Sequence, residues 1–553
     1  MSSMEFPASL TRIGDIVDAN AKNRKNQTAI AYYEYGFENS FSEFRDICRQ
    51  VAKGLMALGV KRGDHIAVWA NNLPEWVYTQ FGSAMAGAVL VTVNTNFRAY
   101  ELEYLLEQSD STTLILSHGV REPDEYLRIL RRVCPEVDHC QPGRLETQKL
   151  PFFKNIVHLG KNDIPGMFTW SQMIELGSRI PDAELDQRAQ SLEPDEVIMM
   201  QYTSGTTGYP KGVMLTHRNL IGNARSMAEI MALGPDDTLC IPVPFFHCFG
   251  CVIGTMCCTV SGAAMAPVTG FDPKLVLETI EALKCTALHG VPTMFIAELE
   301  AMENREYDTA QLRTGVMAGS TCPVEVMKGV MEKMGAKELT IVYGQTESSP
   351  GITQTRRDDS LKVCTETVGR ALPNVEVKIV DTVTGQTLPP GETGELCSRG
   401  YHIMKGYYKM PDKTKEAIDP DGWLHTGDLA SMDEHGNCTI QGRLKDMIIR
   451  GGENIYPREI EEFLYNMEDI LDVQVVGIPS AKYGEEVGAF VILKKGSDCA
   501  PEDVRDFCRG QISRYKIPKY VAMVNSFPMT ASGKVQKFIL RDNAGKWFPD
   551  SGS

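Results

Sequence analysis

The chain has 553 residues, of which 43% are hydrophobic and 23% charged, and its formal net charge at pH 7 is −16. A chain of this length does not fold around one hydrophobic core, so we expect at least two domains. The composition is that of an ordinary globular protein, and the negative charge argues against a nucleic-acid-binding protein, which needs a basic face.

The cysteines and the two ends of the chain indicate the cellular compartment to expect. The 15 cysteines lack the regular spacing of a disulfide scaffold, so we expect reduced, mostly buried thiols in a cytoplasmic protein. The first 20 residues have no apolar core and contain Glu5, Asp15 and Asp18, which argues against a signal or transit peptide. The final Ser-Gly-Ser is not a peroxisomal targeting tripeptide.

The N-terminal third alternates between helix and strand signals. Ser40 and Glu43 form a capping box, after which apolar residues recur at helical spacing. The apolar runs 66–69 and 89–93 lie on either side of a helix predicted from about 74 to 86. Strands and helices in this alternation predict a parallel sheet covered by helices.

Two other segments give weaker signals. Residues 134–165 show no clean period and are predicted to be a loop or insertion. Residues 238–271 contain no Asp, Glu, Lys or Arg, but prolines, glycines and His247 interrupt the apolar run. We therefore expect a buried helix–strand pair that lines an apolar pocket, and no transmembrane segment. Cys248 and Cys251 have the spacing of metal ligands, yet their apolar flanks favour buried thiols.

Residues 202–213 read YTSGTTGYPKGV and combine hydroxyl side chains, glycines and one lysine. Glycines let backbone N–H groups approach an anion, hydroxyls donate hydrogen bonds, and lysine supplies charge, so this stretch predicts a phosphate-binding loop. It is not a Walker-type loop, because Pro210 precedes Lys211 and Gly212 follows it. The alternative interpretation is a glycine-rich surface turn.

The second half of the chain predicts a change of architecture. A helix is expected to begin at His217, directly after the loop. Short strands and Gly/Pro turns from 375 to 440 predict a small β-rich subdomain. A helix at 457–465 and strands at 473–476 and 489–493 then predict a compact α+β domain.

Further motifs bring polar residues to strand ends and turns. YGQTE, residues 343–347, follows an apolar strand, where an aromatic ring can stack on adenine and a carboxylate can hold Mg²⁺ near phosphates. In DGWLHTGD, residues 421–428, an acid follows a turn and can accept hydrogen bonds from ribose hydroxyls. GRLKD at 442–446 leads into RGGENIYP at 450–457, and PMTASGKV at 528–535 places a lysine on a polar turn.

These motifs, in this order, closely resemble the adenylate-forming superfamily of acyl-CoA synthetases, adenylation domains and firefly luciferase. The chain most resembles the acyl-CoA synthetases that act on fatty or similar organic acids. The resemblance extends from about residue 27 to residue 548. A single Thr-Gly-Asp would be a weak signal, but the loop, the strand-end motifs and the C-terminal lysine together are specific.

The resemblance implies an ATP site. The loop residues that would hold the β- and γ-phosphates are Thr203, Ser204, Gly205, Thr206, Thr207, Gly208 and Lys211. Tyr343 would stack on adenine, with Gly344 and Gln345 beside it, and Thr346 would contact the α-phosphate. Glu347 would bind Mg²⁺, with Thr203 as a second metal ligand.

The resemblance also assigns roles in the second half of the chain. Asp428 and Arg443 would bind the ribose, and Lys534 would bridge the substrate carboxylate and the α-phosphate while the acyl-adenylate forms. Lys445 matches the hinge about which a small domain turns between half-reactions. The loop residues that would border the pantetheine tunnel of coenzyme A are Gly451, Gly452 and Glu453.

The acyl and CoA sites are less sharply defined. His247 matches the family position beside the acyl carboxylate, and Gly319 and Ser320 are expected to border the nucleotide and acyl sites. Between residues 507 and 541 there are seven basic residues and no acid. This run is either a solvated basic face or a landing place for the phosphates of CoA.

The expected fold is α/β combined with α+β. Residues 1–443 would form a large N-terminal ATP- and acyl-binding domain of helix-covered β-sheets, with the β-rich subdomain at 375–440. Residues 444–446 would be the hinge, and residues 447–553 a small mobile C-terminal α+β domain.

The expected activity is that of an ATP-dependent carboxylic acid–CoA ligase, acting on a medium- or long-chain fatty acid with Mg²⁺. Acyl-AMP and pyrophosphate would form first, then acyl-CoA and AMP, without a protein nucleophile. An aryl-acid CoA ligase would share every ATP residue and remains an alternative. A stand-alone adenylation enzyme with another acceptor is disfavoured, because residues 238–271 offer no carboxylate for a substrate ammonium. The expected partners are the acid, ATP and CoA, with a possible homodimer.

Overall fold

The computed structural model describes residues 10–120, 122–203, 210–319, 322–450, 453–480, 482–529 and 535–548. The chain forms two compact units. The first comprises the residues up to 376 together with 399–424, and the second comprises 377–398 together with the residues from 425 onward. The second unit thus begins before the expected hinge at 444–446, which stays a prediction.

The first unit contains a nine-stranded sheet with the strand order β16-β15-β14-β13-β12-β10-β11-β1-β2. Its strands are β1 (Thr28–Tyr32), β2 (Phe37–Ser40), β10 (Thr238–Ile241), β11 (Ala264–Pro267), β12 (Ala287–Gly290), β13 (Thr314–Ala318), β14 (Glu338–Gly344), β15 (Gly351–Gln354) and β16 (Arg370–Ala371). All neighbours from β14 across to β1 pair in parallel, whereas β2, β15 and β16 pair antiparallel. The carboxyl ends of the parallel strands therefore lie at one edge of this sheet.

An eight-stranded sheet in the same unit has the order β19-β9-β8-β4-β3-β5-β6-β7. Its strands are β3 (His65–Trp69), β4 (Val89–Thr92), β5 (Ser111–Leu116), β6 (Asn155–His158), β7 (Phe168–Thr169), β8 (Val197–Thr203), β9 (Lys211–Thr216) and β19 (Gly406–Tyr407). The strands from β8 to β7 in this order are parallel, and β9 and β19 are antiparallel to their neighbours. The predicted parallel sheet is thus confirmed.

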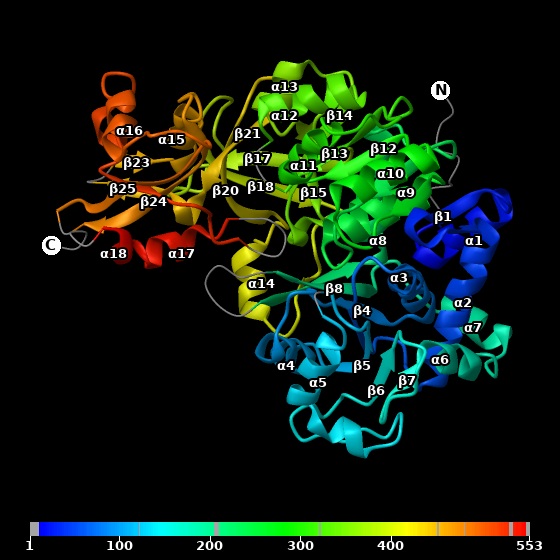
Figure 1. Cartoon of the computed structure of the whole chain (residues 1–553). Helices are drawn as coiled ribbons and strands as arrows, with labels where there is room; N and C mark the ends of the chain where they lie inside the picture. Colours follow the sequence, from blue (N-terminus) through cyan, green and yellow to red (C-terminus); the bar gives the residue numbers. More distant parts are fainter. Residues whose placement is uncertain are drawn as a thin grey trace. The chain divides into compact units, whose positions relative to one another are not determined.

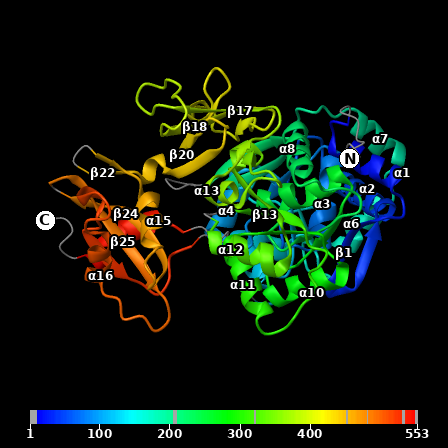
Figure 2. The same ribbon diagram turned by 90° about the horizontal axis from the view of Figure 1, so that it is seen from above.

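Helices cover both sheets, and α1, α2 and α3 lie side by side in both views (Figures 1 and 2). The helices of this unit are α1 (Ile13–Asn23), α2 (Phe41–Ala57), α3 (Pro74–Ala86), α4 (Ala99–Gln108), α5 (Glu125–Val133), α6 (Trp170–Gly177), α7 (Asp182–Gln190), α8 (His217–Ile230), α9 (Cys257–Ser261), α10 (Pro273–Leu283), α11 (Pro292–Met302), α12 (Val324–Gly329), α13 (Leu361–Glu366) and α14 (Pro411–Ala417). The capping box is confirmed: the Glu43 N–H donates to Ser40 Oγ at 3.3 Å, and the Ser40 N–H donates to Glu43 Oε2 at 2.8 Å.

The loop predicted at 134–165 is wrong in one respect. Strand β6 lies inside this segment, is fully buried, and pairs in parallel with β5. A four-residue strand buried on both faces has no polar face and therefore no alternation to recognise. A 3₁₀ helix, η2 (Pro135–His139), lies in the same segment.

The second unit contains two sheets. The strands of the first, in the order β17-β18-β20-β21, are β17 (Val375–Val380), β18 (Gly394–Gly400), β20 (Leu424–Met432) and β21 (Cys438–Arg443). The elements of the C-terminal part are β22 (Ile448–Arg450), β23 (Glu453–Ile455), α15 (Pro457–Leu464), β24 (Ile470–Ser480), β25 (Gly484–Leu493), α16 (Pro501–Cys508), β26 (Tyr520–Met523), α17 (Lys537–Asp542) and α18 (Ala544–Trp547). The helix and strands expected there are present, and the mixed α/β and α+β fold class is confirmed.

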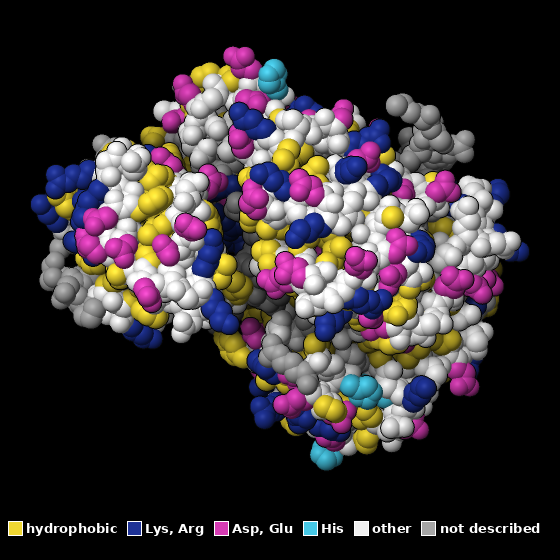
Figure 3. All heavy atoms as spheres, turned by 45° about the horizontal axis from the view of Figure 1, so that its top comes forward, with side chains coloured by type: hydrophobic (Ala, Val, Ile, Leu, Met, Phe, Trp, Pro, Cys, Tyr) yellow, Lys and Arg dark blue, Asp and Glu magenta, His cyan; other side chains and the backbone are white. Residues whose placement is uncertain are grey.

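The uncharged segment 238–271 is buried. It forms β10, a π-helix η3 (Phe249–Met256), α9 and β11, and nearly all of its residues are inaccessible to solvent. Within the described part of the chain, no helix has the length and hydropathy needed to cross a membrane. On the surface drawn in Figure 3, acidic and basic side chains are interspersed.

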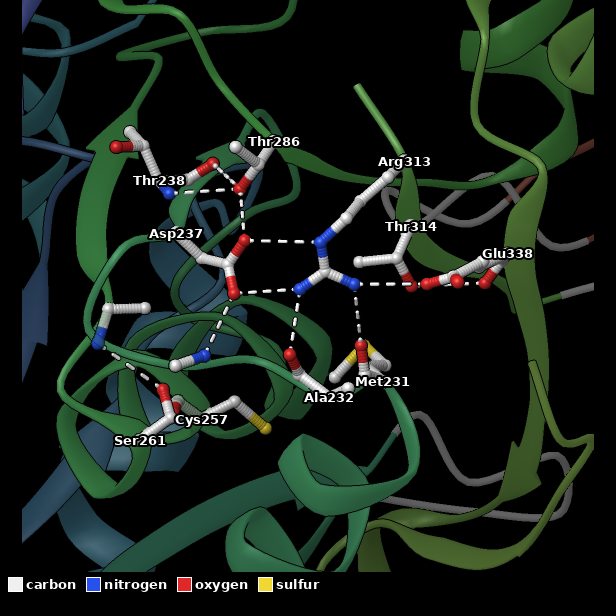
Figure 4. Close-up of polar contacts among 12 residues, drawn as sticks. Met231, Ala232, Asp237, Thr238, Cys257, Ser261, Thr286, Arg313, Thr314 and Glu338 are labelled. Atoms are coloured by element: carbon white, nitrogen blue, oxygen red, sulfur yellow. Dashed lines mark hydrogen bonds and ion pairs between the residues drawn. The ribbon is translucent and has the colours of Figure 1, made fainter. Parts of the chain in front are cut away.

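The amino ends of the parallel strands are joined by a polar network (Figure 4). Arg313, directly before β13, donates to both oxygens of Asp237, at 3.3 and 2.7 Å, and to Glu338 Oε2 at 3.1 Å. Its guanidinium also donates to two carbonyl oxygens that follow α8, those of Met231 and Ala232. Because one side chain contacts residues at the starts of β10 and β14, it holds these strands in register at this edge.

Candidate active site

Predicted site residues follow the carboxyl ends of three parallel strands in the nine-stranded sheet. His247 comes after β10, Gly319 directly after β13, and Tyr343 lies at the end of β14. Ligands of open α/β sheets bind at this edge, because the loops that leave the strands converge there. The sheet topology therefore brings motifs about 100 residues apart to one edge.

Glu347 lies in a short 3₁₀ turn, η5 (Thr346–Ser348), directly beyond β14. Its Oε1 accepts a hydrogen bond from the hydroxyl of Tyr407 at 2.7 Å. The Nζ of Lys211 lies 3.9 Å from the centre of the Tyr407 ring, a cation–π contact. Burial lowers the pKa of Lys211, while Glu347 acts in the opposite direction. Tyr407 thus contacts both Lys211, from the predicted phosphate-binding loop, and Glu347, the carboxylate of YGQTE.

Strand pairing creates this contact. Lys211 begins β9, which pairs with β8 so that Lys211 lies opposite Thr203. Tyr407 on β19 pairs with Val213 on β9. The Oγ1 of Thr203 is buried and has no hydrogen-bond partner among the described residues. A buried hydroxyl in this state can still bond to a ligand or a metal ion. Loop residues 204–208 lie outside the described residues.

His247 lies between β10 and the π-helix η3, a helix type that often marks functional sites. The N–H of Phe249 donates to His247 Nδ1 at 3.2 Å, which places the hydrogen of the neutral ring on Nε2. Cys248 Sγ lies 3.8 Å from the same nitrogen and 4.0 Å from Thr346 Oγ1. The expected carboxylate-binding histidine and the expected α-phosphate contact are therefore neighbours.

Two glycines permit close backbone packing at this edge. A Cβ on Gly344 would lie 1.8 Å from the carbonyl oxygen of Pro350, so only glycine fits there. Gly319 has φ +94°, in the region that favours glycine. Gln345 donates its N–H to Ser348 Oγ at 3.0 Å, which holds the turn that carries Glu347. Ser320 lies outside the described residues.

The second unit carries the predicted ribose residues. Asp428 on β20 pairs with Arg443 on β21, and Arg443 Nε lies 3.2 Å from Asp428 Oδ1. Burial lowers the pKa of Lys445 to about 8, and the neighbouring charge of Arg443 contributes in the same direction. Lys445 lies in η6 (Leu444–Asp446), between β21 and β22.

The remaining predicted CoA and catalytic residues are not described in full. Gly451, Gly452 and Lys534 lie outside the described residues, and of Glu453 only the backbone, in β23, is described. In the basic run at 507–541, most cations pair with acids from other segments or from neighbouring positions. These are Arg509, Lys516, Lys519, Lys537 and Arg541. Such pairing favours a solvated basic face for most of the run.

Residues 17–408 match the AMP-binding enzyme family, and residues 459–534 match the AMP-binding enzyme C-terminal domain. The chain belongs to the AMP-binding enzyme family. The predicted superfamily, an ATP-dependent and adenylate-forming one, is thereby confirmed.

Similar proteins sharpen this assignment. The chain is 54% identical over 541 residues to "Putative acyl-CoA synthetase YngI" of Bacillus subtilis (strain 168), covering 98% of each. It is 38% identical over 538 residues to "Medium-chain acyl-CoA ligase ACSF2, mitochondrial" of Bos taurus, covering 96% of this chain and 87% of that one. It resembles the crystal structure of the anthranilate CoA ligase AuaEII in complex with anthranoyl-AMP, with TM-score 0.83, 26% identity and 99% of each chain covered. The protein is an AMP-forming acyl-CoA ligase, as expected.

Sequence reasoning missed two residues that contact or support the candidate site. Tyr407 joins Lys211 to Glu347, but its only local signal is a Gly-Tyr pair in a turn-rich stretch. His289, at the end of β12, receives the N–H of Val316 on Nδ1 at 3.1 Å and contacts the carbonyl of Ile253 through Nε2, also at 3.1 Å. It thereby ties the π-helix beside His247 to the sheet.

Proposed function

We propose that this ligase activates a medium- or long-chain fatty acid in two steps. The acid's carboxylate attacks the α-phosphate of ATP, which forms acyl-AMP and releases pyrophosphate. The thiol of CoA then attacks the acyl carbonyl carbon and AMP leaves. The first step brings two anions together, so positive charge and hydrogen-bond donors at the α-phosphate lower its barrier.

The contact of Lys211 and Glu347 through Tyr407 is the observation that carries this proposal. It supports a phosphate-binding role for Lys211, next to the carboxylate expected to bind metal. The partnerless Thr203 hydroxyl and the Glu347 carboxylate are oxygen donors of the kind that Mg²⁺ prefers. Mg²⁺ held by these two residues would supply positive charge beside the phosphates. Thr346 would contact the α-phosphate, and Tyr343 would stack on adenine.

The segment around His247 supports the proposed class of acid. Residues 238–271 carry no Asp, Glu, Lys or Arg and are mostly buried, which supports an uncharged, apolar acyl chain beside the histidine. The relative ACSF2 is named as a medium-chain acyl-CoA ligase, which supports a medium-chain acid. The likeness to an anthranilate CoA ligase makes an aryl acid the second candidate. A different acceptor than CoA is the third.

The roles of the second unit complete the proposal. Asp428 and Arg443 bind the ribose, and Lys534 bridges the carboxylate and the α-phosphate. Lys445 is the hinge that lets Lys534 leave and the loop 451–453 approach the acyl-adenylate. The reduced thiols support a cytoplasmic location, and a homodimer is the proposed assembly, which light scattering of the purified protein tests.

The substrate proposal is tested by CoA-dependent AMP release with a panel of straight-chain acids of short, medium and long chain and matched aryl acids. The largest kcat/KM is expected for a medium or long aliphatic acid. A preference for benzoate-type acids would replace the proposal with the aryl alternative. Acyl-AMP formation that CoA does not convert to acyl-CoA and AMP would indicate a different acceptor.

Separate half-reactions test the two lysines. Lys534→Ala is expected to abolish acyl-AMP formation while acyl-CoA still forms from supplied acyl-AMP. Lys445→Pro is expected to show the reverse, because it stiffens the hinge. Equal loss of both steps in Lys534→Ala would contradict its role, and an unimpaired second step in Lys445→Pro would contradict the hinge.

A further inference from the structure

Three metal-ligand side chains meet in the second unit, apart from the residues assigned to the reaction. Glu395 and Cys397 lie two positions apart on β18 and therefore share one face of the sheet. His425 lies on the neighbouring strand β20 (Figure 1). One ligand atom from each of the three lies within 4.8 Å of the other two. Among the described residues, this is the one group with such an arrangement.

The distances in this Glu395–Cys397–His425 cluster approach those of a metal site. His425 Nδ1 lies 2.8 Å from Glu395 Oε2 and 3.5 Å from Cys397 Sγ. Bonds of about 2.0–2.3 Å to a tetrahedral Zn²⁺ place its ligand atoms roughly 3.3–3.8 Å apart. Cys397 is buried, while the side chains of Glu395 and His425 are 13% and 34% exposed, so the cluster faces solvent on one side.

Hydrogen bonds from Thr426 and Gly427, the two residues after His425, hold β18 and the Glu395 carboxylate in place. The N–H of Gly427 donates to Glu395 Oε1 at 2.9 Å, which leaves the other carboxylate oxygen directed at the histidine. The hydroxyl of Thr426 donates to the carbonyl oxygen of Leu396 at 2.7 Å and ties the two strands together. Outer contacts of this kind fix metal ligands in position.

We propose that Glu395, Cys397 and His425 bind a thiolate-preferring divalent cation, Zn²⁺, with water as the fourth ligand. The S–H bond of Cys397 breaks, an S–Zn bond forms, and the proton passes to solvent. The hydrogen on His425 Nδ1 moves to Nε2 through solvent, so that the Nδ1 lone pair binds the metal. One proton is released for each Zn²⁺ bound. Mg²⁺ does not compete, because it prefers oxygen ligands.

The site lies three residues before Asp428 on the same strand. A metal bound there connects β18 with the start of β20, the segment that leads to the proposed ribose ligand. The metal site itself does not depend on the proposed substrate or on the role of Asp428.

Spectroscopic titration of the full chain with Co²⁺, a stand-in for Zn²⁺, tests the proposal. The wild type is expected to bind one equivalent with a thiolate-to-cobalt charge-transfer band, which Zn²⁺ removes and excess Mg²⁺ does not. Cys397→Ser should lose this band. Cys438→Ser, which alters a buried cysteine on β21, the strand on the far side of β20 from β18, is the matched control and should keep it.

A second variant keeps the test decisive if Cys397→Ser does not fold. His425→Gln is expected to weaken Zn²⁺ binding by at least about tenfold. Calorimetry in two buffers of different ionisation enthalpy should show about one proton released per metal ion. A wild type without the charge-transfer band, or a Cys397→Ser variant that retains it at wild-type affinity, would overturn the proposal.

Discussion

The two edges of the nine-stranded sheet differ in how their polar groups are satisfied. At the amino edge, Arg313 donates to two carboxylates and two carbonyl oxygens, so this network is internally complete (Figure 4). At the carboxyl edge, Glu347 follows β14 and accepts a hydrogen bond from Tyr407 of the eight-stranded sheet. In that second sheet Lys211 lies on the Tyr407 ring, and the buried hydroxyl of Thr203, opposite Lys211, has no partner among the described residues. The strands β10, β13 and β14 contribute to both edges.

The same strands therefore contribute to stability at their amino ends and to the proposed chemistry at their carboxyl ends. A saturated ion-pair network lowers the energy of the folded chain but offers no group to a substrate. Charges and hydroxyls that are incompletely satisfied in the protein gain most when a charged ligand arrives. Substitutions at the amino edge should therefore reduce stability, and substitutions at the carboxyl edge should reduce activity.

The largest effect is expected for Glu347→Gln. Loss of the proposed metal ligand should lower kcat for acyl-AMP formation by at least about 100-fold, with little change in melting temperature. Glu338→Gln is the matched control, because Glu338 lies at the opposite end of the same strand, β14. It should retain kcat. Acid-dependent exchange of pyrophosphate into ATP measures kcat for acyl-AMP formation in both variants. Equal losses of kcat in Glu347→Gln and Glu338→Gln would contradict the functional difference between the two edges.

Arg313→Met should lower the free energy of unfolding by about 2 kcal/mol, between the values typical of exposed and buried ion pairs. Asp237, whose side chain is 11% exposed, would lose its principal partner. Activity per folded molecule should not change. Urea unfolding measures the difference, and Lys328→Met, which removes an exposed ion pair on α12, is the control that should leave the unfolding midpoint unchanged. A large loss of kcat in Arg313→Met would contradict the account.

Tyr407→Phe tests the two contacts of Tyr407 separately. It removes the hydroxyl that donates to Glu347 but keeps the ring under Lys211, so kcat/KM for ATP should fall about fivefold, the equivalent of one hydrogen bond of about 1 kcal/mol. Tyr408→Phe alters the next residue, whose hydroxyl donates to Asp110 instead, and should leave kcat/KM unchanged. Equal changes of kcat/KM in the two variants would show that the hydrogen bond from Tyr407 to Glu347 does not contribute to activity.

The last prediction concerns pH and His289. Burial lowers the pKa of this histidine from 6.5 to about 4. Between these values the unfolded chain binds a proton that the folded chain does not, so stability falls as the pH decreases from 6.5 towards 4. The slope is at most about 1.4 kcal/mol per pH unit for one group. His289→Gln should reduce the slope of urea stability against pH over this range.

Local motifs were predictable from the sequence, whereas contacts made by strand pairing were not. YGQTE follows β14 as expected, because an apolar strand and its polar end are adjacent in the chain. Tyr407 is 60 residues from Glu347 and reaches it only because β19 pairs with β9. The Glu395–Cys397–His425 cluster likewise needs two strands side by side. Strand β6 was missed because it is buried on both faces.

Isotope transfer from the substrate tests the central claim, attack of the acid on the α-phosphate, most directly. The ligase is supplied with ATP, CoA and a fatty acid whose carboxylate oxygens are both ¹⁸O. If acyl-AMP forms, one labelled oxygen remains in the phosphate of the released AMP, and mass spectrometry detects it. AMP without label, or label in inorganic phosphate together with ADP, would contradict the account.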